Sequence, residues 1–241
     1  PTDTVLAFPG SNYPAAVGGD RAGGWLVAGY RGPNEPSSAF PTADAQPLLM
    51  RTSPTGVLKW ATTSLVTNAS IATIATDAPD YPGHVVVAGV RNAHQFKNNG
   101  LMWLAEVDVS GDQGPVLFRS GHCSGGQTTI GKQGLYANTV ARLSGGDWLV
   151  GGYALVDYDG TAVITPAWCR FDSELKPVGA AAIAKESGNT TGWQIREVVA
   201  APTGGFWTVT TNLGSARWQT YDAAGELLSD LPIASGAKEA I

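Results

Sequence analysis

Side chains with binding chemistry gather in three segments rich in polar residues, at 31–46, 91–100 and 154–166. Together they offer guanidinium, amide, carboxylate and aromatic groups, which can hydrogen-bond to a hydroxyl-rich ligand or to a peptide. Solvated loops are polar in most proteins, so no single residue type identifies a site. The candidate ligand-binding residues are Arg31, Asn34, Glu35, Arg91, His94, Gln95, Asp157, Tyr158, Asp159 and, further along the chain, Trp193.

Catalytic motifs are incomplete in this sequence. The segment GHCSG at 121–125 has the spacing of a nucleophile elbow, but that elbow leads from a strand into a helix, and no helical period follows Cys123. The three histidines form no HExxH motif or close pair, so metal catalysis is not indicated. We expect no catalytic residue, no metal and no cofactor. One alternative stays open, because two carboxylates on separate repeats could hydrolyse a glycan.

An internal repeat supplies the elements that must position these side chains. Successive spacings from Trp25 to Val85, Trp148 and Phe206 are 60, 63 and 58 residues. Alternating apolar residues between Gly, Pro and Asx clusters predict four short strands in each repeat. The repeated phrases are GGWLVAGY (23–30), PGHVVVAGV (82–90), GGDWLVGGY (145–153) and GGFWTVTT (204–211).

Tandem four-stranded units are typical of a β-propeller, because one small sheet cannot bury both of its faces. We predict an all-β fold, a β-propeller of four-stranded antiparallel blades, in a single domain over 1–241. The repeats cover approximately 11–67, 68–130, 131–190 and 191–241. A solenoid of the same units is the structural alternative. Residues 1–10 resemble the fourth strand of a blade. They could close the ring, either by completing a blade or as part of a fifth one. Alternatively, the chain belongs to a larger ring that is completed by a second polypeptide.

Loop lengths place the candidate residues on one face of the predicted disc. Connections from second to third strands, and from fourth strands to the next first strand, share one face and include the longest segments. We call it the long-connection face, and binding residues concentrate on such loops. Trp193 precedes a first strand there, with Tyr13 and Tyr136 at neighbouring equivalent positions. Tryptophans at repeated strand positions are expected to pack between blades instead: Trp25, Trp103, Trp148, Trp168 and Trp218.

The two cysteines, Cys123 and Cys169, lack CxxC spacing and nearby histidine pairs, which argues against a zinc site. Cys123 follows the last strand of the second repeat, and Cys169 lies in the third strand of the third. Adjacent blades would bring them together, so we predict a disulfide. Disulfides are typical of oxidising compartments, and the chain begins at Pro1 as a processed product does. We therefore expect a secreted or periplasmic location.

Blades reading GG-W-hydrophobic-VAG, followed by a strand, a D-x-x-G-like turn and a final Trp, occur in bacterial secreted β-propeller repeat proteins. GGWLVAGY with MRTSPTGVLKW (50–60) resembles that class, and the resemblance runs through all four repeats. It implies a scaffold rather than an activity. WD and kelch signatures are absent from the sequence.

The charge and hydropathy of the sequence restrict the classes of partner that the chain is expected to bind. The net charge is −5 and no Lys/Arg cluster interrupts it, so nucleic acid is not an expected partner. No apolar run approaches the roughly 20 residues of a membrane span. We expect a non-catalytic, lectin-like module that binds a glycan or surface polymer, or a peptide, on the long-connection face. A glycan-active hydrolase or lyase, and a structural subunit of a propeller completed by another chain, are the alternatives.

Overall fold

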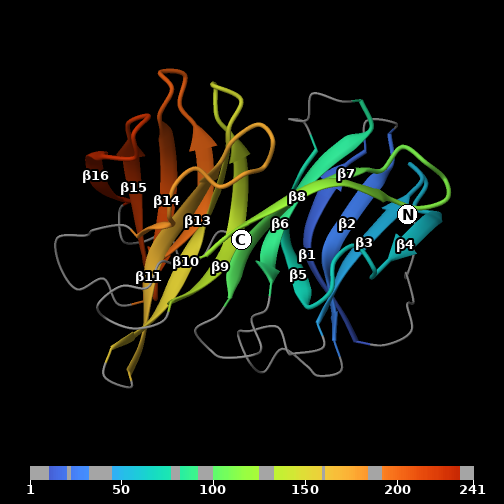
Figure 1. The fold of residues 1–241 in the computed structure, drawn as a ribbon, viewed down its shortest axis with the longest axis horizontal. Helices are drawn as coiled ribbons and strands as arrows, with labels where there is room; N and C mark the ends of the chain where they lie inside the picture. Colours follow the sequence, from blue (N-terminus) through green and yellow to red (C-terminus); the bar gives the residue numbers. More distant parts are fainter. Residues whose placement is uncertain are drawn as a thin grey trace.

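The computed structural model describes residues 11–20, 23–32, 45–76, 82–91, 100–124, 133–158, 161–183 and 192–233. These residues form four four-stranded antiparallel sheets and no helix (Figure 1), which confirms the predicted all-β propeller fold. Within those ranges, no helix is long and apolar enough to cross a membrane. The ring-closing role predicted for residues 1–10 falls outside the described residues.

Each sheet is an up-and-down meander in which strands that follow each other in sequence are neighbours. The first sheet contains β1 (Ser11–Gly19), β2 (Trp25–Gly32), β3 (Gln46–Thr52) and β4 (Leu58–Thr62). The second contains β5 (Ala69–Ala75), β6 (His84–Arg91), β7 (Leu101–Asp108) and β8 (Val116–Cys123). The third contains β9 (Gln133–Arg142), β10 (Trp148–Tyr158), β11 (Thr161–Phe171) and β12 (Ala182–Ile183), and the fourth contains β13 (Gln194–Ala200), β14 (Phe206–Asn212), β15 (Ser215–Tyr221) and β16 (Leu227–Ile233).

A bulge between the first and second strands recurs at the same place in every sheet. Beside it, three sheets carry a glycine, because a Cβ there would collide with a carbonyl oxygen of the first strand, that of the residue before the one opposite the glycine. These glycines are Gly29, Gly89 and Gly152. The fourth sheet has Thr210 at this position. In these three sheets, the glycines of the repeated phrase therefore permit the close approach of the two strands at the bulge.

Successive sheets pack through their first strands. β5 packs on β1–β3, β9 on β5–β7 and β13 on β9–β11. The three largest apolar clusters lie at these junctions, so the core is divided between neighbouring blades. No strand of the first sheet packs to a comparable extent on the fourth sheet within the part of the chain that the structure describes. The first and fourth sheets are thus the two ends of an arc of blades (Figure 1).

The predicted packing of tryptophans between blades is confirmed inside the arc, and it is wrong for Trp25 at one end. Trp103, Trp148 and Trp168 are buried between blades. Trp25 was predicted to be buried, but it is 52% exposed. The reason is that its side of the first sheet would be covered by a preceding blade, and no sheet of the described residues packs there to the extent seen at the inner junctions. Trp218, on the opposite end of the arc, is only half-buried.

The predicted disulfide is confirmed, and the turns between third and fourth strands have their own side-chain hydrogen bonds. Cys123 at the end of β8 forms a disulfide with Cys169 in β11, with Cα atoms 6.3 Å apart, so the bond joins the second and third blades. Aspartates that begin the turns between third and fourth strands accept backbone hydrogen bonds, as short polar side chains at turns do. The Oδ1 atom of Asp172 accepts from the amides of Glu174 and Lys176 at 2.9 and 2.8 Å.

Candidate functional site

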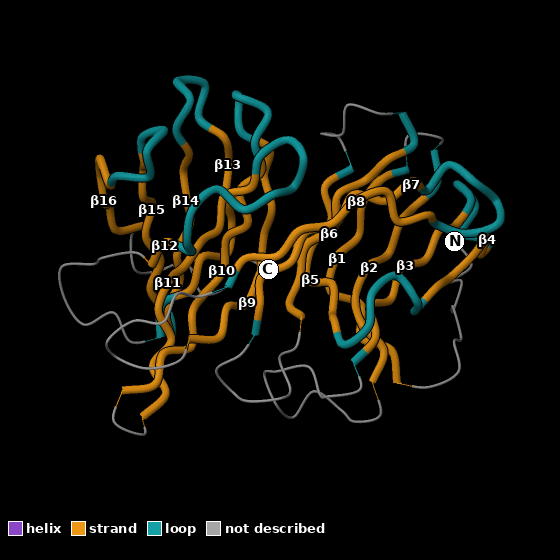
Figure 2. Tube along the Cα trace, viewed as in Figure 1, coloured by secondary structure: helices purple, strands orange, loops and turns teal. Residues whose placement is uncertain are grey.

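The long-connection face is the edge from which the β10–β11 hairpin extends in Figure 2. Five connections on this edge include segments outside the described residues, at 33–44, 92–99, 125–132, 159–160 and 184–191. The predicted ligand-binding residues Asn34, Glu35, His94, Gln95 and Asp159 lie in undescribed positions, so their roles stay predictions.

The segment 154–166 was predicted to be a loop, and that prediction is wrong. β10 and β11 continue pairing from Ala154 with Thr165 to Tyr158 with Thr161. Their apolar side chains continue the core, since Leu155 and Val156 are both buried. Asp157 and Tyr158 thus belong to the end of a strand at the tip of a long hairpin rather than to a broad loop.

Arg31 and Arg91 occupy equivalent positions at the ends of β2 and β6, each two residues after the bulge glycine. Each stands at the base of a long connection on the long-connection face. The Nε atom of Arg91 is buried and has no hydrogen-bond partner among the described residues. An unpaired guanidinium N–H at that depth is a donor available to the connection above it or to a ligand.

Trp193 forms part of a cluster with two residues that the sequence analysis did not identify. The guanidinium carbon of Arg217 in β15 lies 5.4 Å from the centroid of the Trp193 ring. Arg217 Nη1 donates to Asp230 Oδ2 at 2.6 Å, and both side chains are partly exposed. This trio, the indole cluster, combines an aromatic ring, a cation and a carboxylate held in fixed orientation.

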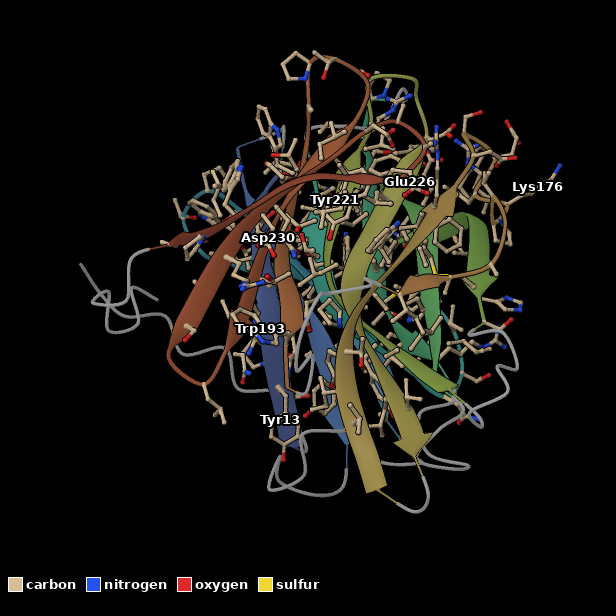
Figure 3. The ribbon with its side chains drawn as sticks, turned by 90° about the vertical axis from the view of Figure 1, so that its left-hand side faces the viewer. Tyr13, Lys176, Trp193, Tyr221, Glu226 and Asp230 are labelled. Carbon is tan, nitrogen blue, oxygen red and sulfur yellow. A yellow bond between two sulfur atoms is a disulfide. The ribbon has the colours of Figure 1, made fainter. Side chains whose placement is uncertain are left out.

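The indole cluster lies on the fourth sheet toward the long-connection face. In Figure 3, Trp193 is nearer than Asp230 and Tyr221 to the edge from which the β10–β11 hairpin extends. Gly192 donates its amide to the carbonyl of Ile164 at 2.9 Å, which anchors the chain before Trp193 to the hairpin. The predicted position of Trp193 beside this face is therefore consistent with the structure.

The residue type at position 217 distinguishes the fourth repeat from the other three. In the register of the sheets, Arg217 pairs with Thr210, whereas Leu48, Trp103 and Ala167 pair with the bulge glycines at the same place. Those three residues are buried and apolar. A charged residue at a position that is otherwise apolar marks the fourth repeat as different.

Buried polar groups continue from the indole cluster into the junction between the third and fourth blades. Thr208 Oγ1 and Tyr221 Oη each donate to Gln219 Oε1, at 3.4 and 3.2 Å. Gln219 Nε2 and Asp230 Oδ1 are buried without a hydrogen-bond partner in the described ranges, and the two residues are paired across β15 and β16. One donor and one acceptor beside the cluster thus remain available for water or a ligand.

Tyr13 and Tyr136 are not isolated side chains at the axis. Tyr13 stacks on Tyr30 and Tyr136 stacks on Tyr153, with ring centroids 4.8 and 4.9 Å apart. Burial raises the pKa of Tyr136 to about 12. Burial and the neighbouring Tyr136 also raise the pKa of Tyr153. Tyr136 and Tyr153 are therefore protonated at neutral pH and act as packing groups.

Charged pairs on the opposite edge of the blades link neighbouring blades. Arg51 pairs with Asp20 and Arg170 with Asp147, both at 2.7 Å. Each arginine also donates to a turn carbonyl of the next blade, Arg51 to Ser110 at 3.2 Å and Arg170 to Ala223 at 2.8 Å. These arginines hold neighbouring blades together. In the described ranges, no three His, Cys, Asp or Glu side chains form a group that could hold a metal ion.

Comparisons with known proteins add little to this geometry. No protein-family model matches the chain, and no curated protein matches it. Among solved structures, a calcium-binding protein, regucalcin, from Agrobacterium tumefaciens is similar, with 12% identity and a TM-score of 0.33. The match covers 90% of this chain and 75% of that one.

Proposed function

We propose that this chain is a non-catalytic, lectin-like recognition module of a secreted or periplasmic protein, which binds a glycan or surface polymer on its long-connection face. The observation that carries the proposal is the indole cluster. Its ring lies toward the edge of the propeller that also carries the long connections and Arg91, and its guanidinium and carboxylate stand beside the ring on β15 and β16.

The chemistry of the cluster suits a sugar. An indole offers a flat apolar surface of the kind on which the C–H face of a pyranose packs, while its N–H can donate. Asp230 holds Arg217 through one nitrogen, which leaves other guanidinium N–H groups for ligand hydroxyls. Few convergent polar groups around an aromatic surface are typical of small-ligand sites.

The disulfide between Cys123 and Cys169 supports an oxidising compartment, where extracellular glycans and polymers are met. The negative charge of the chain disfavours strongly acidic polymers, since a net charge of −5 repels them at low ionic strength. Neutral or amino-sugar polymers are thus the expected class.

A glycan array probed with the wild-type chain and with Trp193→Ala tests the proposal. We expect binding to a neutral glycan that Trp193→Ala weakens at least tenfold. Phe118→Ala is the matched control, because Phe118 is an exposed aromatic ring with the Arg119 guanidinium carbon 5.5 Å from its centroid, on a different blade. It should bind like wild type.

Two outcomes contradict the proposal. Equal glycan binding by wild type and Trp193→Ala would show that the indole cluster is not part of the binding site. Shortening of the bound glycan over time, seen by mass spectrometry, would establish the hydrolase or lyase alternative instead. Substitution of His94 and Gln95 by alanine on the same array tests the predicted role of the 91–100 segment.

A further inference from the structure

The two ends of the arc expose apolar faces that elsewhere in the fold are buried. On the first sheet, the uncovered side carries Pro14, Val17 and Trp25, and we call it the first-sheet face. On the fourth sheet, the uncovered side carries Val199, Trp207, Val209, Trp218, Leu231 and Ile233, and we call it the fourth-sheet face. Both are contiguous by register, as side chains of alternate residues on neighbouring strands are.

The first-sheet face matches the side by which inner blades pack on the blade before them. By register, Trp25 is equivalent to Phe206 and Val17 to Val198. Phe206 and Val198 are 3% and 2% exposed, because the third blade covers them, whereas Trp25 and Val17 are 52% and 65% exposed. The first sheet thus has an aromatic residue and a valine at the positions of Phe206 and Val198, but no preceding blade covers them in the described structure.

The fourth-sheet face is the side that each inner blade offers to the next, with one difference: Val209 stands at the position that Gly151 has in the third sheet. Trp218 is equivalent to Trp168, and Trp207 to Leu149. Trp168 is buried against Phe206 and Tyr221 of the next blade, with ring centroids 5.7 and 5.0 Å away. Trp218 instead contacts Trp207 of its own sheet, at 5.7 Å, and Leu231 beside it is 59% exposed.

The chain therefore carries both halves of one more blade junction, at opposite ends. We infer that the fourth-sheet face of one copy packs on the first-sheet face of a second copy, and that two copies close a ring of eight blades. The continuity of each face with the three junctions inside the chain carries this inference. Eight blades lie within the usual range of propellers, and two identical junctions close by a two-fold axis.

Closure within one copy conflicts with the packing of the inner junctions. The third and fourth blades are in close contact at Gly151, where an added Cβ atom would collide with Val198 and Ile195. Bringing the first sheet onto the fourth would open these contacts, which dense packing resists. Within one copy, the described first and fourth sheets therefore do not cover each other.

The proposed junction lacks a contact that two of the three inner junctions have. The position of Arg51 and Arg170, which reach the turn of the next blade, is Thr220 in the fourth sheet. The junction between copies therefore rests on apolar packing, and we expect the ring to dissociate at low protein concentration.

Sedimentation equilibrium over a range of concentrations tests the inference. Wild type should pass from the monomer of 24.9 kDa to a species of twice that mass. Val17→Lys should weaken the pairing at least tenfold. Val116→Lys should not, although Val116 on β8 is 64% exposed and Val17 is 65% exposed. A wild-type chain that stays monomeric, a larger ring or filament, or pairing that Val17→Lys leaves intact would overturn the inference.

Engineered cysteines distinguish the source of the partner. Val209 is equivalent to Gly151, and Val17 is equivalent to Val198. Gly151 and Val198 are in contact across the inner junction. Cysteines at Val209 of one copy and at Val17 of the other should therefore lie within disulfide reach. An oxidised mixture of Val17→Cys and Val209→Cys chains should give a covalent pair of one of each. In the double variant, a disulfide within a single chain would show closure by one copy and contradict the inference. Either result is independent of glycan binding.

Discussion

The Trp168 ring of the third blade packs on the Tyr221 ring of the fourth, with centroids 5.0 Å apart. Both side chains are buried, and Phe206 completes the group. This contact between blades is the kind that holds the arc together, because no single sheet has a core of its own.

Trp168→Ala should therefore lower the free energy of unfolding by about 3–5 kcal/mol, the usual loss for a large buried aromatic. Urea unfolding followed by circular dichroism measures it. Trp218→Ala is the matched control at the equivalent, half-buried position, measured at a concentration where the chain is monomeric. A loss for Trp218→Ala as large as that for Trp168→Ala would contradict the division of the core described above.

Removing the disulfide should also loosen a junction between blades. The Cys123→Ala/Cys169→Ala variant loses a cross-link with a sequence separation of 46 residues, and we expect a loss of about 2–4 kcal/mol. The same unfolding assay measures it. Addition of a reductant should destabilise wild type by a similar amount and leave the double variant unchanged.

Asp108 links stability to acid pH. Hydrogen bonds from the Ser110 hydroxyl and then from the Ser110 amide lower the pKa of this carboxyl. A carboxyl with a lowered folded-state pKa contributes stability above its unfolded pKa of about 4 and loses it as the pH falls through the folded pKa. Asp108→Asn should lower stability at neutral pH and reduce its fall below about pH 4. Unfolding midpoints that shift equally for both proteins at all pH values would contradict this.

Tyr136 links stability to alkaline pH. Its pKa of about 12 exceeds the ordinary value of 10.0, because burial disfavours the phenolate. The group therefore contributes stability that is complete below about pH 10 and lost as the pH rises toward 12. Tyr136→Phe should remove part of this alkaline loss, and titration of tyrosinate absorbance should show one late-ionising group fewer. An unchanged titration would contradict the buried environment of Tyr136.

The sequence predicts the blades because strand alternation, glycine-led phrases and a spacing near 60 residues are local and repeated. The Cys123–Cys169 bond follows from the same repeat, since it joins neighbouring blades. Trp25 shows the limit. Its residue type and position predict burial, but burial depends on whether another blade covers that side, and this is a property of the assembly.

The site was less predictable. The β10–β11 hairpin was taken for a loop because Asp157 and Asp159 resemble turn residues, although Leu155 and Ile164 continue the strand pattern on either side. Arg217 and Asp230 were missed because each lies in a strand, and only the register of β14, β15 and β16 brings them beside Trp193. Contacts across strands depend on pairing, which the order of residues alone does not display.

The most direct test of the proposed function is the affinity of the best array glycan for the Arg217→Met variant, measured by calorimetric titration. Methionine preserves an apolar side chain over Trp193 but removes the N–H donors and the pairing with Asp230. We predict a loss of at least tenfold in affinity for a variant that circular dichroism shows to be folded at the assay temperature. An affinity equal to that of wild type would contradict a recognition site at the indole cluster.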